Sequence, residues 1–333
     1  MAANLFKLAL TTTLSLLFLC SLIAVYIHDQ LSIPVSKDSV FTIEPGSNLS
    51  AITKRLIRDD LLPINVIAFK AFALLTRDAG SIQAGQYQLK AGMASQDVLA
   101  LFRSGEVIRY RITFPEGLRV KEWLARLQEA PYLDSQTTGM TREELGRSLG
   151  LTTELEGSLF PDTYQYILGE SDLDILKLAI RKMKAVLGDE WRGRSMTAIS
   201  TPFEALILAS MIEKETGYGP EREKIASVFH NRLDVGMKLQ SDPTVIYGLG
   251  ADFDGDLKRS HLRSDTPYNT YTRTGLPPGP ICSPGRAAIN AAIGGSSHPY
   301  FYFVAMGDGK SQFSVTLEEH NRAVNRYQRK RKQ

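Results

Sequence analysis

Two glutamates stand at the end of the most apolar helical stretch in this sequence. The stretch begins near Phe203, carries apolar residues on all its faces as far as Ile212, and closes with Glu213, Lys214 and Glu215. A helix that is apolar all round is buried in the protein. Acids at its C-terminal end face the negative end of the helix dipole and lose hydration, and both effects raise a carboxyl pKa. Since a general acid needs a raised pKa at neutral pH, this pattern predicts a catalytic carboxyl.

Helix geometry alone does not choose between Glu213 and Glu215. The two lie about 200° apart around a helix, and both sit over apolar rows. Either side chain could instead form a structural ion pair with Arg222 or Lys224, which follow in the next predicted helix. We expect the ion pair at Glu213 and the chemical role at Glu215.

The sequence predicts no metal site and no cofactor. The five histidines are scattered without metal-ligand spacing, and the two cysteines, Cys20 and Cys282, form no CxxC motif. The aspartates within residues 252–256 alternate like a calcium loop, but Arg263 stands where such a loop needs a bidentate glutamate. We therefore interpret this segment as a solvated turn.

Length and composition indicate a globular protein of two domains with an appendage. The chain has 333 residues, of which 43% are hydrophobic and 23% charged. A net charge of only +3 does not point to nucleic acid as a partner. Because strands and helices do not alternate as a parallel sheet requires, the predicted fold class is α+β.

An uncharged stretch near the N-terminus predicts a membrane anchor. Residues 8–27 contain no charged side chain, and this run is long enough for a helix that spans a bilayer. A cleaved signal peptide is the alternative, but no small-residue cleavage site ends the stretch. Lys7 precedes it and Asp29 follows it, so residues 1–7 are expected in the cytoplasm. The remainder of the chain is then expected in the periplasm, anchored to the plasma (inner) membrane by one pass.

Residues 39–105 form a compact unit whose pattern predicts the order strand, helix, helix, strand, helix. The first strand is expected at Phe41, and the second within residues 85–89. Ser47 and Ser95 are expected to cap helices. The run IEPGSNLSAITKRL resembles the opening of a LysM-type domain, which implies glycan binding in the cell wall. The same turn and capped helix also occur in unrelated folds.

Several blocks of the sequence resemble one enzyme family. They read EGSLFPDTY, ASMIEKETG, VFHNRL, LQSDPTVIYG, TPYNTY, GLPPGPI and YFYFVA, in this order. They closely resemble the endolytic murein transglycosylases, the YceG-like family, over nearly the whole chain. In that family the second glutamate of the E-K-E-T block is catalytic, which corresponds to Glu215. The resemblance makes residues 106–333 a catalytic transglycosylase domain.

The chemistry of that family needs one acid. Lytic transglycosylases cleave the bond between N-acetylmuramic acid and N-acetylglucosamine without water and leave a 1,6-anhydro end. The resemblance also implies sugar contacts at Gln240, Tyr268 and Asn269, because other transglycosylases place a glutamine and a Tyr-Asn pair near the acid. The alternative for the loop of Gln240 is a turn in which Asp242 caps the next helix.

The expected partners follow from the same resemblance. They are peptidoglycan glycan strands, the membrane, and cell-wall synthases, and the enzyme would terminate or trim nascent strands. One alternative is a non-catalytic, membrane-anchored scaffold that binds peptidoglycan. Another is a hydrolase, which differs only in the product it releases.

Overall fold

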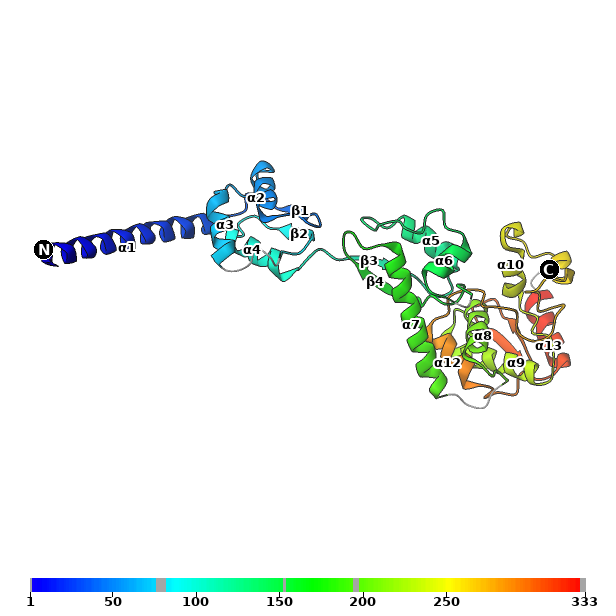
Figure 1. Ribbon diagram of the computed structural model, residues 1–333. Coiled ribbons are helices and arrows are strands. Elements are labelled where there is room, and N and C mark those ends of the chain that lie inside the picture. The colour runs from blue at the N-terminus through cyan, green and yellow to red at the C-terminus, as the bar shows by residue number, and fades with distance from the viewer. Residues whose placement is uncertain (1, 76–81, 152–153, 194–197, 330–333) are drawn as a thin grey trace. The chain divides into compact units, whose positions relative to one another are not determined.

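The computed structural model describes residues 2–75, 82–151, 154–193 and 198–329. The chain forms two compact units (Figure 1). Unit 1 consists of residues 1–110 and 166–169, and unit 2 consists of residues 111–165 and 170–333. Each has its own hydrophobic core. The predicted mixture of helices and short strands is therefore present as an α+β fold.

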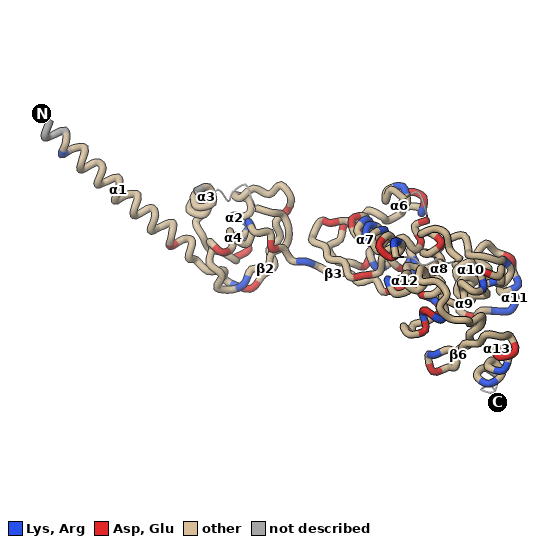
Figure 2. The backbone as a smooth tube through the Cα atoms, turned by 90° about the horizontal axis from the view of Figure 1, so that it is seen from below, with Lys and Arg blue, Asp and Glu red and all other residues tan. Residues whose placement is uncertain are grey.

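The N-terminal helix α1 (Ala2–Ser32) is long and apolar enough to cross a membrane, and among the described residues no other helix passes that test. Figure 2 shows it almost free of charged residues, with blue and red only toward its two ends. The uncharged residues 8–27 lie inside it. The helix continues past them, and Leu31 in its last turn is 5% exposed and packs in the core of unit 1. The end of α1 is thus part of the folded unit.

The rest of unit 1 has the predicted element order. It runs β1 (Ser39–Ile43), α2 (Leu49–Arg58), α3 (Val66–Leu75), β2 (Gly85–Leu89) and α4 (Ser95–Ser104). The two strands are antiparallel, with Ser39 opposite Leu89 and Ile43 opposite Gly85. Their inward side chains and the helices enclose an apolar core in which Tyr87 and Phe102 pack edge to face.

Two of the predicted helix caps are wrong by one residue. The N-cap of α2 is Asn48, whose side chain accepts a hydrogen bond from the amide of Ala51, and not Ser47. The N-cap of α4 is Ala94, so Ser95 is already the first helical residue. The buried hydroxyl of Ser95 instead donates to the carbonyl of Ile33, which ties α4 to the chain that leaves α1.

Unit 2 is built mainly of helices, with two short two-stranded sheets, β3–β4 and β5–β6, among its described residues. The elements in chain order are β3 (Tyr110–Thr113), α5 (Val120–Gln128), α6 (Arg142–Ser148), β4 (Thr163–Tyr166), α7 (Asp172–Arg192), α8 (Pro202–Glu215), α9 (Arg222–Asp234), α10 (Asp242–Leu249), α11 (Arg259–Arg263), α12 (Arg286–Gly294), β5 (Tyr302–Ala305), β6 (Ser311–Ser314), α13 (Leu317–Val324) and the π-helical turn η4 (Asn325–Arg329).

Helix α8 is the centre of unit 2. It starts with Thr201 as N-cap, Pro202 in the first turn and Glu204 completing a capping box, all of which favour a helix start. Residues 205–212 are then buried without interruption, as the all-round apolar pattern predicts. Helices α7, α9, α10 and α12 pack around it. A helix enclosed in this way is a rigid support for whatever side chain stands at its end.

Candidate functional site

Glu215 is the last residue of α8 and lines a pocket of about 370 Å³. The pocket lies within unit 2 and is formed by the end of α8, the last turn of α9, the start of α10, strand β5 and the C-terminal helices. Its lining consists of Glu215, Arg232, Gln240, Asp242, Tyr271, Phe303, Val304, Ala305, His320, Val324 and Gln328. The lining of the pocket is mainly polar near α10 and apolar along β5. Such a combination is typical of a site that binds a sugar ring.

The carboxyl of Glu215 has an unusual pKa. The pKa is raised from its ordinary value of 4.5 to about 7, mainly by burial and in smaller part by the nearby negative charge of Asp242. The hydroxyl of Ser241 and the positive charge of Arg232 act in the opposite direction, because both favour the carboxylate. A carboxyl balanced in this way is protonated in a large share of molecules at neutral pH, yet it can also accept a proton. It can therefore serve as acid and as base.

Ser241 orients the carboxyl of Glu215. Its Oγ donates to Oε1 of Glu215 across 2.5 Å, while its own side chain is only 2% exposed. The amide of Ser241 donates to Oγ1 of Thr270, and its carbonyl accepts from Oγ1 of Thr244. The hydroxyls of Thr244 and Thr270 lie 2.9 Å apart. This buried network fixes Ser241, so the acid is held in one orientation.

Arg232 places a positive charge on the wall of the pocket. It comes from α9 and is 6% exposed. Its Nε donates to the carbonyl of Phe301 and its Nη1 to the carbonyl of Leu239, each across 2.7 Å. Burial lowers its pKa, and the hydrogen bonds join α9 to the loop before α10 and to the start of the β5–β6 hairpin. The residue thus supports two walls of the site and favours an ionised Glu215.

Asp242 and Tyr271 form a second polar pair in the same pocket. The hydroxyl of Tyr271 donates to Oδ1 of Asp242 across 2.5 Å. The pKa of Tyr271 is raised by burial and by this bond, so the phenol stays a donor. Asp242 lies in the first turn of α10, and Ser241, one residue earlier, is the N-cap. The alternative in which Asp242 itself caps the helix is therefore wrong, because its carboxylate pairs with Tyr271.

Glu213 has the structural environment expected for it. Its Oε1 lies 3.4 Å from the guanidinium of Arg222, and its Oε2 accepts from the amide of Gly285 across 2.9 Å. The predicted ion pair with Arg222 is confirmed. Burial raises the pKa of Glu213 as well, but its carboxyl is bound on both oxygens and is absent from the lining of the pocket. Glu213 and Glu215 therefore point to different surroundings, and only Glu215 lines the pocket.

Of the three predicted sugar contacts, only Gln240 lies in the pocket with Glu215. Its backbone has a φ of +51°, a left-handed conformation, and its backbone amide donates to the carbonyl of Thr270. Asn269 is fully buried, and its side-chain nitrogen donates to three carbonyls at the end of α11, including that of the C-cap Ser264 at 2.6 Å. A sugar contact through Asn269 does not fit this position, because its hydrogen-bonding groups are already used.

Tyr268 also lies outside the pocket of Glu215. Its ring packs against that of Tyr247 with 4.8 Å between centroids. The hydroxyl of Tyr247 in turn lies 3.3 Å from Oε2 of Glu156. Glu156 is 2% exposed, accepts from the amide of Val120 and lies 3.9 Å from the guanidinium of Arg142. This cluster is a satisfied buried network that joins α5, α6 and α10.

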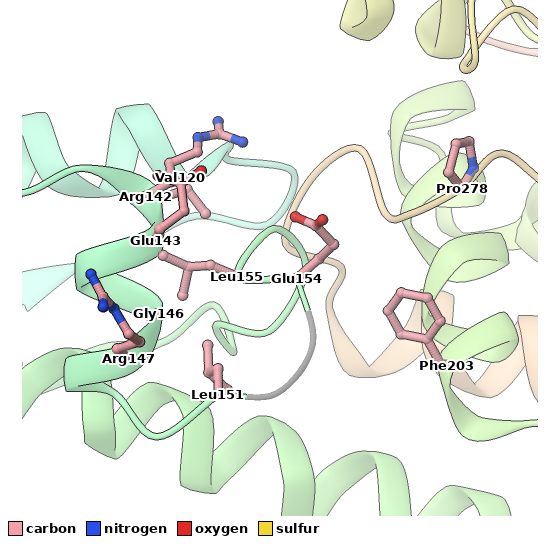
Figure 3. Close-up of a pocket in the computed structure, with 10 residues that line it drawn as sticks. All are labelled: Val120, Arg142, Glu143, Gly146, Arg147, Leu151, Glu154, Leu155, Phe203 and Pro278. Carbon is pink, nitrogen blue, oxygen red and sulfur yellow. The ribbon is translucent and has the colours of Figure 1, made fainter.

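A larger pocket, of about 530 Å³, lies above that network (Figure 3). Figure 3 shows Arg142, Glu143 and Arg147 on one wall and Phe203 and Pro278 on the opposite wall, with Glu154 between them. The buried acid beneath it, Glu156, has partners on both oxygens. The smaller pocket is the better candidate for chemistry, because the buried acid Glu215, whose pKa is raised to about 7, lines it.

The site offers no evident place for a metal ion. Throughout the part of the chain that the structure describes, no three or more His, Cys, Asp and Glu side chains come together as a ligand group. The polar atoms around Glu215 are those of a proton-transfer site, with one carboxyl, one hydroxyl donor, one guanidinium and one Asp–Tyr pair.

Sequence reasoning missed Arg232 as a member of the site, and within the block TPYNTY it selected Tyr268 and Asn269 in place of Tyr271. Arg232 follows two other polar residues, His230 and Asn231, in its helix, and Tyr271 is the second of the two tyrosines in its block. The apolar wall from β5 was also missed. The only sequence signal for these residues was their presence in the blocks VFHNRL, TPYNTY and YFYFVA, which periodicity alone does not explain.

Comparison with known proteins assigns the chain to a family. The sequence model of the YceG-like family matches residues 41–326, which is most of the chain. The chain belongs to the YceG-like family. The matched residues include every side chain that lines the pocket of Glu215 except Gln328.

Relatives in the YceG-like family carry a common name. A protein of Bacillus subtilis named endolytic murein transglycosylase is 34% identical over 319 residues, covering 88% of this chain and 87% of that protein. A protein of the same name from Streptococcus pneumoniae is 28% identical, and the match covers 90% of this chain but only 60% of that longer protein. A crystal structure of a YceG-like protein from Listeria monocytogenes superposes with a TM-score of 0.53 at 28% identity, covering 86% of this chain and 99% of the other.

Proposed function

We propose that this chain is an endolytic lytic transglycosylase that cleaves peptidoglycan glycan strands, with Glu215 as the catalytic acid and base. The observation that carries the proposal is the position of Glu215. It ends a rigid buried helix, its pKa is raised to about 7, and it opens into a polar pocket. The names of the YceG-like relatives from Bacillus and Streptococcus support the same activity.

The reaction needs two proton transfers at one carboxyl. Protonated Glu215 donates its proton to the bridging oxygen, and the bond from C1 of N-acetylmuramic acid to O4 of N-acetylglucosamine breaks as an oxocarbenium-like centre develops. The resulting carboxylate then takes the proton of the muramyl C6 hydroxyl, whose oxygen bonds to C1. The ring closes as a 1,6-anhydro sugar, no water is consumed, and Glu215 returns to its acid form.

The neighbours of Glu215 suit both steps. Arg232 and the hydroxyl of Ser241 stabilise the carboxylate that forms after the first transfer. Asp242, whose carboxylate is held by Tyr271, opposes the loss of that first proton before substrate binds and offers negative charge toward the positive centre that develops on the sugar. Gln240 lines the same pocket, which supports a role for it in hydrogen-bonding the sugar beside the cleaved bond.

The remaining parts of the proposal concern location and substrate delivery. The apolar helix α1 anchors the enzyme in the plasma (inner) membrane, with residues 1–7 in the cytoplasm and the folded units in the periplasm. Residues 39–105 act as a LysM-like subdomain that binds glycan, and residues 106–333 form the catalytic domain. An anchored enzyme of this kind would trim or terminate nascent strands beside the cell-wall synthases.

The test is a digest of purified peptidoglycan with the full chain in lipid nanodiscs, followed by mass spectrometry of the released ends. We expect 1,6-anhydromuramyl ends that disappear with Glu215→Gln. Reducing ends would instead indicate a hydrolase. Binding of peptidoglycan without any cleavage, by both the natural chain and the variant, would favour a membrane-anchored scaffold.

A further inference from the structure

Helix α3 exposes apolar side chains along one face. Ile67 is 78% exposed and Leu74 is 65% exposed, and with Ala71 they have the i, i+4, i+7 spacing of a single helix face. The opposite face, which includes Ala68 and Phe69, is buried in the core of unit 1. An amphipathic surface helix would carry polar residues outward, whereas α3 is apolar on the side that none of the described residues covers.

The start of α3 is tied directly to the last turn of α1. Oε1 of Gln30 accepts a hydrogen bond from the amide of Asn65 across 2.8 Å. The side chain of Asn65 in turn caps α3, accepting from the amides of Ile67 and Ala68. Leu31 is buried in the same core. The position of α3 relative to the end of α1 is therefore set by hydrogen bonds and packing within unit 1.

This attachment places α3 at a defined level relative to the uncharged run of α1. Gln30 follows the last residue of that run, Ile27, by three positions, which corresponds to about 4.5 Å along a helix axis. Figure 1 shows α3 on the side of unit 1 from which α1 emerges. If residues 8–27 fill the hydrocarbon core, the first turn of α3 lies at the level of the lipid headgroups.

We propose that α3 is an interfacial helix, which inserts Ile67 and Leu74 into the surface of the same bilayer that α1 spans. The inference depends on the proposed anchoring role of α1. A lipid surface is the occupant that fits, because α3 packs against α1 and its first turn lies at headgroup level. Lys70, partly exposed between the two apolar residues, can extend its ammonium group to the lipid phosphates.

Attachment to the membrane through both α1 and α3 restricts the orientation of unit 1 more than attachment through α1 alone. A single spanning helix joined to a domain by a loop lets the domain rotate over the membrane. Here the last turn of α1 belongs to the core of unit 1, and α3 adds a second contact with lipid. Unit 1 is therefore held in one orientation on the membrane surface.

The test measures the lipid depth of nitroxide labels on the full chain in nanodiscs of phosphatidylethanolamine and phosphatidylglycerol. Labels are placed by Ile67→Cys and Leu74→Cys, each in a Cys20→Ser background. Val40→Cys is the matched control, because Val40 is an apolar residue of unit 1 that is 50% exposed on β1, which Figure 1 shows away from α1. The natural Cys20, which is exposed within α1, reports the depth of the anchor itself.

The remaining cysteine does not interfere with labelling. Cys282 is fully buried, and burial raises the pKa of its thiol, so it reacts poorly. Collisions of each label with oxygen, which concentrates in lipid, are compared with collisions with a water-soluble nickel complex. We expect the oxygen-to-nickel ratio at positions 67 and 74 to exceed that at position 40 and to lie below that of Cys20, which is within the hydrocarbon core.

Three outcomes would overturn the inference, and they differ from one another. A lipid-like ratio at Cys20 with water-like ratios at positions 67 and 74 means that α1 spans the membrane and α3 lies clear of it. Low collision rates with both reagents at positions 67 and 74 mean that a protein surface covers α3. A water-like ratio at Cys20 means that the anchor itself fails, and the proposed membrane location fails with it.

Discussion

Ser241 donates a hydrogen bond from its hydroxyl to Oε1 of Glu215 across 2.5 Å, joining two residues that are 26 positions apart in the chain. Burial favours the neutral acid at Glu215, whereas this hydrogen bond favours the carboxylate. Their opposition leaves the pKa at about 7. A residue that must first give and then take a proton needs both the neutral acid and the carboxylate to be accessible. The hydrogen bond from Ser241 makes the carboxylate accessible.

The variant Glu215→Gln should lose turnover and gain stability at alkaline pH. Because the pKa is raised from 4.5 to about 7, the stability that Glu215 contributes is fully present below the lower value and is lost as pH rises through the higher one. The neutral glutamine avoids that loss, which amounts to on the order of 3 kcal/mol. Urea unfolding at about pH 5 and about pH 8, followed by tryptophan fluorescence, measures the difference. Equal gains at both pH values would contradict this account.

Glu213→Gln is the matched control for that experiment. The substitution weakens the ion pair with Arg222 while the amide oxygen can still accept from Gly285, so we expect a loss of about 1 to 3 kcal/mol in the free energy of unfolding. Turnover should be retained apart from the loss of folded protein. An inactive but stably folded Glu213→Gln, together with an active Glu215→Gln, would show that the other glutamate is the acid.

The variant Ser241→Ala should slow catalysis and move its pH dependence. Without the hydroxyl, the carboxyl of Glu215 loses its fixed orientation, and kcat should fall roughly 10- to 100-fold. The pKa of Glu215 should rise, because the removed donor favours the carboxylate. The alkaline limb of the rate profile should then move to higher pH, as measured by release of anhydromuramyl ends. A profile that moves to lower pH would mean that Ser241 acts in some other way.

The variant Asp242→Asn should shift the same limb in the opposite direction. The negative charge of Asp242 raises the pKa of Glu215, so its removal lowers that pKa and shortens the pH range in which the acid form exists. Tyr271→Phe keeps the charge but removes the hydroxyl that holds the carboxylate. We expect Tyr271→Phe to lower kcat without the same acid shift. Identical pH profiles for Asp242→Asn and the natural enzyme would exclude the electrostatic role.

Asn269→Ala should act on stability. The buried amide bonds three carbonyls and accepts from the amide of Tyr271, so its removal leaves several buried polar groups without partners. A cost of about 2 to 4 kcal/mol in unfolding free energy is expected. Measured below the midpoint of unfolding, KM should stay close to that of the natural chain. A large rise in KM without any loss of stability would restore the direct sugar contact that the sequence resemblance implied.

Local patterns in the sequence were sufficient for several features. The uncharged run of residues 8–27 predicted helix α1, and the apolar pattern that ends at Glu215 predicted the buried helix α8. The order of elements in unit 1 and the ion pair of Glu213 with Arg222 were also predictable. Each depends on residues close in the chain, whose periodicity and charge report burial and pairing directly. The N-cap residues of α2 and α4, Asn48 and Ala94, could not be predicted exactly, since neighbouring polar residues are equally suited to the N-cap position.

Only the tertiary structure decided which side chains surround Glu215. Ser241, Asp242 and Tyr271 reach it from loops and helix starts far along the chain, and Arg232 reaches it from the face of α9 that packs inward. It also showed that Gln240 lines the pocket, whereas the side chain of Asn269 is buried and hydrogen-bonded to nearby backbone groups. Spacing along a chain carries no information on such convergence, because it depends on how whole helices pack and which buried polar groups must find partners.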